Sequence, residues 1–342
     1  MRTRIGDRWR TARANVRGSA IVLSYHRVAL LRADPQLQAV TPERFAEQIG
    51  LLSRHYAMLG AGELLELMTR GRPIPKRGIV VTIDDGYADS LLHAKPILSS
   101  LSVPATVFVS SDYVGGSREF WWDELERTVL HADTLPEVLD VEAGGSHYCV
   151  RVDAESGAAP DSDGWNVAEA PRTQRQRIYL DLCVFVRELS AAHREIALGS
   201  LREQLGTPAL VRPSRRPLSA AELRDLVDGG LIEIGAHTRS HQLLSASSET
   251  EQRDEILGSK EALERLTGQD VRSFAYPYGG LDAFSRTSER LVREAGFLGA
   301  LTTGFGIVVP WMDRFAVPRC PADDIGGYEF LDRIERWFEM AR

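Results

Sequence analysis

Short runs of apolar residues alternate along this chain with longer segments in which apolar residues recur at helical spacing. The short runs end in polar or charged residues and predict strands at 21–23, 79–83, 106–109, 232–234, 273–276 and 299–302. The longer segments predict helices at 42–58, 87–98, 219–228, 249–266 and 284–294. Thr41 as a cap and Pro42 in the first turn mark the start of the first helix. This repetition is typical of a parallel α/β sheet, either open and doubly wound or closed into a barrel.

The alternation breaks between 112 and 217. Glycine, proline, serine and aspartate gather there, most densely at 157–164, and the clearest regular element is a predicted helix at 173–190. Because structureless loops of this length are uncommon in compact domains, we expect an inserted helical or mixed subdomain. The predicted division is an arginine-rich N-terminal arm at 1–19, the main domain at 20–111 and 218–342, and the inserted subdomain at 112–217.

The composition is that of an ordinary globular protein. Of 342 residues, 43% are hydrophobic and 26% charged, and the formal net charge of −7 argues against nucleic acid as a partner. The three scattered cysteines fit neither a disulfide framework nor a CxxC metal site and favour a reducing compartment. No apolar run resembles a secretory signal or a transmembrane segment, so we expect a cytoplasmic protein. The N-terminal arm is interpreted as a solvated helix or as a peripheral contact to anionic lipid, and the sequence leaves the oligomeric state open.

Residues able to hold a metal ion or a proton follow three of the predicted strands. They are His26, then Asp84 with Asp85, then His237 with His241. In both α/β architectures, ligands bind at the carboxyl ends of the strands. If these strand ends converge, the five residues form one site.

Each of these groups allows a functional and a structural interpretation. Adjacent aspartates at a strand end point in different directions, so one carboxylate can bind a divalent cation while the other accepts a proton from water. The alternative is a turn in which the second aspartate caps the next helix. Two histidines four residues apart can share a metal ion if they lie on one helical face, and the alternative is a polar surface loop. Two imidazoles and one carboxylate leave coordination positions open, as expected of a catalytic site.

Three motifs occur in this order along the chain: VTIDDGY at Val81–Tyr87, HTRSH at His237–His241 and FAYPYG at Phe274–Gly279. Together they resemble the motifs of the polysaccharide deacetylase family, also called NodB homology or carbohydrate esterase family 4. The resemblance covers 21–109 and 220–321. It implies a distorted (β/α)7 barrel of the NodB-homology type, here with a large inserted subdomain. It also implies metal-dependent removal of an acyl group, usually acetate from an N-acetylated sugar.

The resemblance also implies roles for single residues. By motif position, Asp84 is similar to the general base of the family, with metal-bound water as the nucleophile. The residues similar to the ligands of the divalent metal, most commonly Zn²⁺, are Asp85, His237 and His241. The third motif contains Pro277 and Tyr278, and the backbone N–H of Tyr278 is similar to the family donor that holds the developing oxyanion.

Two family features are missing from their usual places. The third motif usually carries an arginine two residues before its proline, where this chain has Ala275. The segment ending at Arg319 resembles the exopolysaccharide N-deacetylase branch, and we expect Arg319 to orient Asp84; the alternative is a surface ion pair. No histidine follows His241 to act as the usual late general acid. His26, in a Tyr-His pair that resembles the same branch, is expected to be that acid; the alternative is a buried histidine that bonds the backbone.

Trp121 and Trp122 open the insertion and are interpreted either as a stacking platform for sugar rings or as core residues. The predicted activity is N-deacetylation of an amino sugar in a glycan or in an intracellular glycan intermediate. The protein would then be a hydrolase of linear amide C–N bonds with an N-acetylated carbohydrate substrate. The alternatives are a carbohydrate-binding pseudoenzyme, and a deacylase of O-acetyl or non-sugar amide substrates.

Overall fold

Two units make up the part of the chain that the computed structural model describes, residues 18–154 and 164–340. The first unit takes its described residues from 1–30, 39–114 and 218–342, and the second from 31–38 and 115–217. The insertion expected at 112–217 overlaps the second unit, which also includes 31–38. The expected N-terminal arm lies outside the described residues up to position 17, so its contact with lipid stays a prediction.

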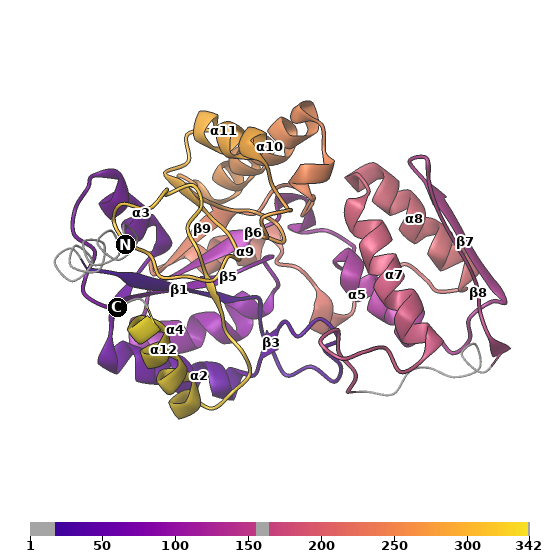
Figure 1. The fold of residues 1–342 in the computed structure, drawn as a ribbon, viewed down its shortest axis with the longest axis horizontal. Coiled ribbons are helices and arrows are strands. Elements are labelled where there is room, and N and C mark those ends of the chain that lie inside the picture. Colours follow the sequence, from indigo (N-terminus) through magenta and orange to yellow (C-terminus); the bar gives the residue numbers. More distant parts are fainter. Residues whose placement is uncertain (1–17, 155–163, 341–342) are drawn as a thin grey trace, which may run out of the picture. The chain divides into compact units, whose positions relative to one another are not determined.

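A curled sheet of parallel strands forms the centre of the first unit (Figure 1). Its main path runs through β11 (Gly299–Leu301), β10 (Ser273–Ala275), β9 (Ile232–Ala236), β6 (Ala105–Val109), β5 (Gly78–Ile83), β1 (Ala20–Tyr25) and β12 (Cys320–Pro321). A further strand, β4 (Ala57–Leu59), pairs with the first half of β5. Leu301 bridges to Val317, and Leu23 pairs with Cys320, so the segment 317–321 links the two ends of the sheet. The predicted α/β class with a curled, barrel-like parallel sheet is confirmed.

Helices follow most of these strands and pack against them. They are α2 (Pro42–His55), α3 (Ala61–Thr69), the π-helical η1 (Ser90–Ala94), α4 (Lys95–Leu101), α9 (Ala220–Val227), α10 (Glu249–Thr267), α11 (Arg286–Glu294) and α12 (Gly327–Met340). Successive residues of β1 belong to different clusters: Ile21 lies in one with Phe45 of α2, whereas Val22 lies in one with Leu64 of α3. This alternation follows from the opposite directions of neighbouring side chains on a strand. Thr41 caps α2 as predicted, by accepting a hydrogen bond from the backbone N–H of Arg44.

The structure corrects two predicted helices. The helix expected at 42–58 ends at His55, because the backbone of 57–59 pairs with β5 as β4. The helix expected at 87–98 begins later, since the chain first completes a turn and then runs through η1 into α4. The pairing that decides these boundaries is between distant segments, which local periodicity does not report.

The second unit contains a hairpin and helices. Its elements are α5 (Trp121–Leu125), the π-helical η3 (Glu126–Leu130), β7 (Val138–Ala143), β8 (Ser146–Arg151), α7 (Gln174–Glu188) and α8 (Ala191–Gln204). The helix predicted at 173–190 is confirmed as α7, and Thr173 caps it in a capping box with Gln176. The unit is therefore of the mixed type that the sequence allowed.

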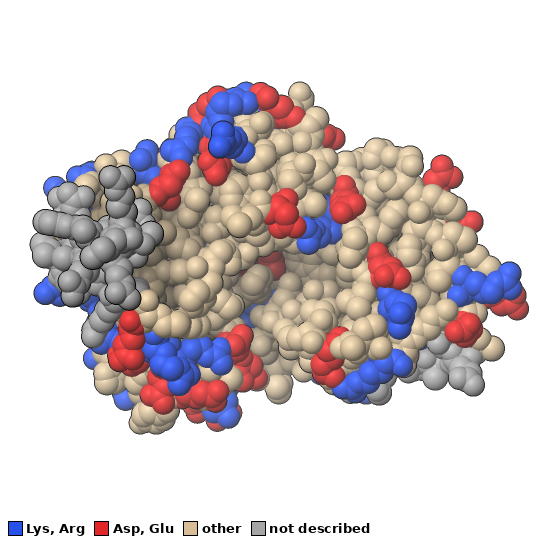
Figure 2. All heavy atoms as spheres, in the orientation of Figure 1, with Lys and Arg blue, Asp and Glu red and all other residues tan. Residues whose placement is uncertain are grey.

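The surface drawn in Figure 2 carries both signs of charge. Lys and Arg side chains lie interspersed with Asp and Glu over α10, α11 and α12, as on a solvated surface. Among the described helices, none combines the length and the apolar content needed to cross a bilayer. The cytoplasmic location stays a prediction.

Candidate active site

The strand ends of the first unit bring the predicted site residues together. His26 follows β1, Asp84 and Asp85 follow β5, and His237 follows β9. Arg319 directly precedes β12, in the segment that links β11 to β1. The residues that follow β1, β5 and β9 lie at the edge of the sheet where ligands bind in parallel α/β folds, and the side chain of Arg319 reaches Asp84 from the segment 317–321.

A tight turn presents the two aspartates. The backbone N–H of Asp84 donates to the Tyr25 carbonyl at 2.9 Å, so Asp84 continues the pairing of β5 with β1. Asp85 and Gly86 then have φ of +73° and +92°, in the left-handed region. A Cβ on Gly86 would lie 2.9 Å from Cγ1 of Val109, so this turn requires glycine. Both carboxylates are almost fully buried.

The two histidines are joined by a turn rather than by a helical segment. Thr238 and His241 have φ of +61° and +55°, so the helical face that the spacing allowed does not form. Glu255 of α10 stabilises the turn, since its carboxylate accepts from the backbone N–H groups of Arg239 and Ser240 at 2.8 and 2.9 Å. It also accepts from the Ser240 hydroxyl at 2.6 Å. The centroids of the His237 and His241 imidazole rings lie 4.8 Å apart.

Asp85, His237 and His241 form a buried cluster of potential metal ligands. Oδ1 of Asp85 lies 3.7 Å from Nε2 of His237 and 3.4 Å from Nε2 of His241. One ligand atom from each of the three lies within 4.8 Å of the others. Two imidazoles and one carboxylate match the three-ligand sets of catalytic zinc sites, so the donors fit a divalent cation.

The environment of His237 prepares it for this role. Its Nδ1 lies 2.8 Å from the carbonyl oxygen of Ala275, so the proton belongs on Nδ1 and the lone pair on Nε2, which faces Asp85. Burial lowers the pKa of His237 to about 4. The ring is therefore neutral near pH 7, as a metal ligand must be.

Asp84 lies between Arg319 and His26. Nη1 of Arg319 donates to Oδ1 of Asp84 at 2.7 Å, and its Nε donates to the carbonyl of Thr302 at 3.0 Å. Oδ2 of Asp84 lies 3.9 Å from Nε2 of His26, whose side chain is 35% exposed. Burial would raise the pKa of Asp84, but the charge and the hydrogen bond of Arg319 outweigh burial and hold that pKa below its usual range. Arg319 is thus buried against Asp84, not on the surface, while its orienting role stays a prediction.

The third motif lies beside the ligand cluster. The Tyr278 ring makes an edge-to-face contact with His241, with centroids 4.7 Å apart, and Pro277 is buried. The Tyr278 backbone has φ of +63°, and its carbonyl accepts from the Thr303 hydroxyl at 2.9 Å. The role of the Tyr278 N–H as an oxyanion donor stays a prediction.

The structure adds a buried ion pair that sequence reasoning missed. Nε of Arg27 donates to Asp89 at 2.6 Å, and its guanidinium lies 3.8 Å from the ring centroid of Tyr87. Arg27 follows His26, and Asp89 follows the turn at Asp84, so the pair connects the segments that carry these two site residues. The sequence did contain a signal for this pair. Arg27 lies directly after the Tyr-His pair and Asp89 lies two residues after the VTIDDGY motif, each beside apolar residues.

Removal of one partner from this pair should destabilise the first unit. We expect Asp89→Ala to lower the free energy of unfolding by about 3–5 kcal/mol, because Arg27 keeps a buried charge without its carboxylate. Glu261→Ala is the matched control, since the exposed pair with Arg265 should be worth at most about 1 kcal/mol. Denaturant midpoints of both variants measure the difference. Equal, small shifts would show that the Arg27 pair contributes no more than a surface contact.

Trp121 and Trp122 belong to the second unit and are each only 4% exposed. Trp122 stacks on Phe120 with centroids 4.8 Å apart, and the two tryptophans meet edge to face at 5.2 Å. This burial favours the core alternative. A sugar-stacking role for these rings stays a prediction.

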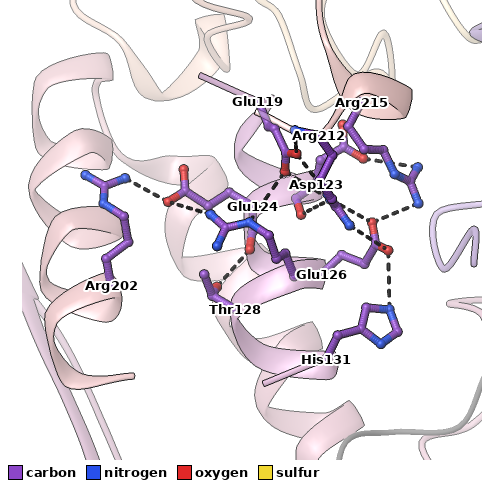
Figure 3. A network of polar contacts seen from close by, with 10 residues as sticks. Glu119, Asp123, Glu124, Glu126, Thr128, His131, Arg202, Arg212 and Arg215 are labelled. Carbon is purple, nitrogen blue, oxygen red and sulfur yellow. Dashed lines mark hydrogen bonds and ion pairs between the residues drawn. The ribbon is translucent and has the colours of Figure 1, made fainter. Parts of the chain in front are cut away.

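Acidic side chains of the segment 119–126 are held by arginines (Figure 3). Arg215 lies 3.2 Å from Asp123 and 2.9 Å from Glu126, and Arg212 lies 2.8 Å from Glu119. The segment that opens the insertion is thereby joined to the segment that closes it. These carboxylates are therefore partners in a polar network within the second unit.

Comparisons with known proteins agree with the motifs. The polysaccharide deacetylase family model matches residues 202–300, a segment that contains the histidine motif and the third motif. The poly-β-1,6-N-acetyl-D-glucosamine N-deacetylase of Escherichia coli strain K12 is 29% identical over 25% of this chain and 13% of its own length. The enzyme of the same name from Staphylococcus epidermidis is 29% identical over 30% of this chain and 39% of its own length. The matches thus span less than half of each relative.

Solved structures share the fold over most of the chain. The deacetylase PplD from Streptococcus pyogenes has a TM-score of 0.57 at 16% identity and covers 92% of this chain and 97% of its own. IcaB from Ammonifex degensii has a TM-score of 0.58 at 17% identity and covers 93% and 96%. The family match over 202–300, the ordered motifs and the shared fold thus make this chain similar to the polysaccharide deacetylases.

Proposed function

We propose that this protein is a metal-dependent N-deacetylase that hydrolyses the acetamide of an N-acetylated amino sugar in a glycan. The observation that carries the proposal is the arrangement of two adjacent buried carboxylates. Asp85 faces the imidazoles of His237 and His241, whereas Asp84 faces Arg319 and His26. The curated relatives are N-deacetylases of poly-β-1,6-N-acetyl-D-glucosamine, which supports the same reaction class and suggests the first substrate to test.

The metal would be held by Asp85, His237 and His241, and we propose Zn²⁺ as the ion because of the two imidazole donors. When bound, a divalent cation would lower the pKa of a water molecule and polarise the carbonyl oxygen of the substrate. The chain's contribution is to fix the donors: the Ala275 carbonyl orients His237, and Glu255 holds the turn that carries His241. This preorganisation limits the motion of the donors.

Proton transfer would be divided between Asp84 and His26. Asp84 accepts a proton from the attacking water as the C–O bond forms, and Arg319 keeps this carboxylate ionised and oriented. His26 donates a proton to the nitrogen as the C–N bond breaks, which yields acetate and the free amine. Because His26 is partly exposed, it can exchange its proton with solvent.

Acetate release tests the proposal directly. We expect the protein to release acetate from β-1,6-linked N-acetylglucosamine oligomers, to lose this activity on treatment with a chelator and to recover it with Zn²⁺. Matched O-acetylated and non-sugar acetamide substrates define the substrate class. Binding of the oligomers without acetate release, under every metal tested, would identify a carbohydrate-binding protein instead.

A further inference from the structure

The solvent-facing side of the β7–β8 hairpin carries several potential metal-ligand side chains that have no part in the proposed reaction. Leu139, Val141 and Ala143 of β7 are buried, whereas the residues that alternate with them are exposed. The antiparallel register pairs Asp140 with Cys149 and Glu142 with His147. Since opposite residues of a strand pair share one face of the sheet, these four side chains lie on the exposed face.

Three of these side chains already lie close together. Nε2 of His147 is 2.7 Å from Oδ1 of Asp140. One ligand atom from each of Asp140, His147 and Cys149 lies within 4.8 Å of the others. Tetrahedral zinc sites, with metal–ligand bonds of about 2.0–2.3 Å, place their donor atoms roughly 3–4 Å apart, so these three donors already lie near that spacing.

The backbone beneath this cluster is well anchored. Gln204 of α8 accepts from the N–H of Asp140 at 3.0 Å and donates to its carbonyl at 2.6 Å. Gly144 and Gly145, both with positive φ, form the tight turn that sets the register of the hairpin. The donors are therefore presented by a paired, anchored hairpin rather than by a loose loop.

The donor set is selective. A thiolate and an imidazole favour Zn²⁺ and similar ions over Mg²⁺ and Ca²⁺, which prefer oxygen ligands. Cys149 is the exposed member of the three cysteines, and all three are free thiols. We propose that Asp140, His147 and Cys149 form a second metal site, for a thiophilic divalent cation of the Zn²⁺ class, with Glu142 opposite His147 available as a fourth ligand. Binding releases the thiol proton of Cys149.

Cobalt titration of the full chain tests this site apart from the proposed active site. In an Asp85→Ala/His237→Ala background, Co²⁺ is expected to bind and to give the near-ultraviolet charge-transfer band of a cobalt thiolate. Zn²⁺ should displace it. Cys149→Ser in the same background should remove the band, and His147→Ala or Asp140→Ala should each weaken the affinity by about tenfold or more.

Thiol reactivity provides a second readout that does not need the double variant. In the wild-type chain, Zn²⁺ should slow the alkylation of Cys149, and His147→Ala should need about tenfold more Zn²⁺, or more, for the same protection. The exposed His93 gives the matched control, since His93→Ala should keep the protection. Absence of the thiolate band together with unchanged alkylation rates would overturn the proposal and leave a surface Asp140–His147 hydrogen bond. These outcomes are independent of whether the chain deacetylates sugars.

Discussion

Asp85→Ala is expected to lose its bound metal and to lower deacetylase turnover by about 10³-fold or more. Metal catalysis supplies several kcal/mol of transition-state stabilisation, and each 1.4 kcal/mol corresponds to about a tenfold change in rate. The Asp85 carboxylate lies within 3.7 Å of Nε2 in both His237 and His241, so its removal opens the centre of the cluster. His237→Ala and His241→Ala should show the same joint loss. Metal analysis after dialysis and acetate release measure the two effects on the same samples.

Asp84→Asn is the matched control for these variants, because it changes the neighbouring carboxylate without removing a proposed ligand. It should keep its metal while turnover falls by about 10²–10⁴-fold, the range for a lost general base. If all three ligand variants kept tightly bound stoichiometric metal, the metal would be bound elsewhere. A metal-free Asp84→Asn protein would show that Asp84 itself holds the ion.

The parallel strands of the barrel were predictable because their central residues are buried on both faces. β1 and β5 are entirely buried, and such strands form continuous apolar runs that end where the chain reaches the polar edge of the sheet. β12 was not predictable in the same way. It contains two residues, Cys320 and Pro321, and its place depends on pairing with β1, almost 300 positions earlier in the chain.

The residues of the site could be predicted from the sequence, but the backbone conformation that orients their side chains could not. The strand-end rule and the ordered motifs brought Asp84, Asp85 and the two histidines together, and the resemblance placed Arg319 beside Asp84. The positive φ values of Asp85 and His241, which decide where the carboxylate and imidazole point, left no mark in the apolar pattern. The support from Glu255 was also hidden, because a helical glutamate near a turn looks like any solvated residue until the tertiary contact is known.

The insertion was the least predictable part of the chain. Its tryptophans allowed both a sugar-stacking and a core interpretation, and each residue is only 4% exposed, which favours the core interpretation. Asp123, the residue after Trp122, pairs with Arg215. The apolar pattern did not distinguish these uses, because a buried aromatic and a binding aromatic have the same composition.

His26→Ala is expected to slow acetamide hydrolysis by about 10²-fold or more while the metal content stays near that of the wild type. The imidazole lies 3.9 Å from Asp84 on the side opposite Arg319, and it follows β1 rather than belonging to the ligand cluster. Without a proton donor, the nitrogen would have to leave as an amide anion, which is a far poorer leaving group than an amine. His55→Ala, at an exposed histidine at the end of α2, is the matched control and should leave both quantities unchanged.

Activated aryl acetates separate proton donation by His26 from a structural role. Their leaving group is stable as an anion, so protonation contributes little to the barrier and the variant should lose far less activity on them than on acetamides. The ratio of the two losses is therefore the quantity to measure, with kcat and KM determined separately for each substrate. Equal losses on both substrates would mean that His26 supports the position of Asp84 or of the metal ligands. A large loss confined to acetamides requires a group that delivers a proton to nitrogen, and in this site His26 has both the chemistry and the solvent access to do so.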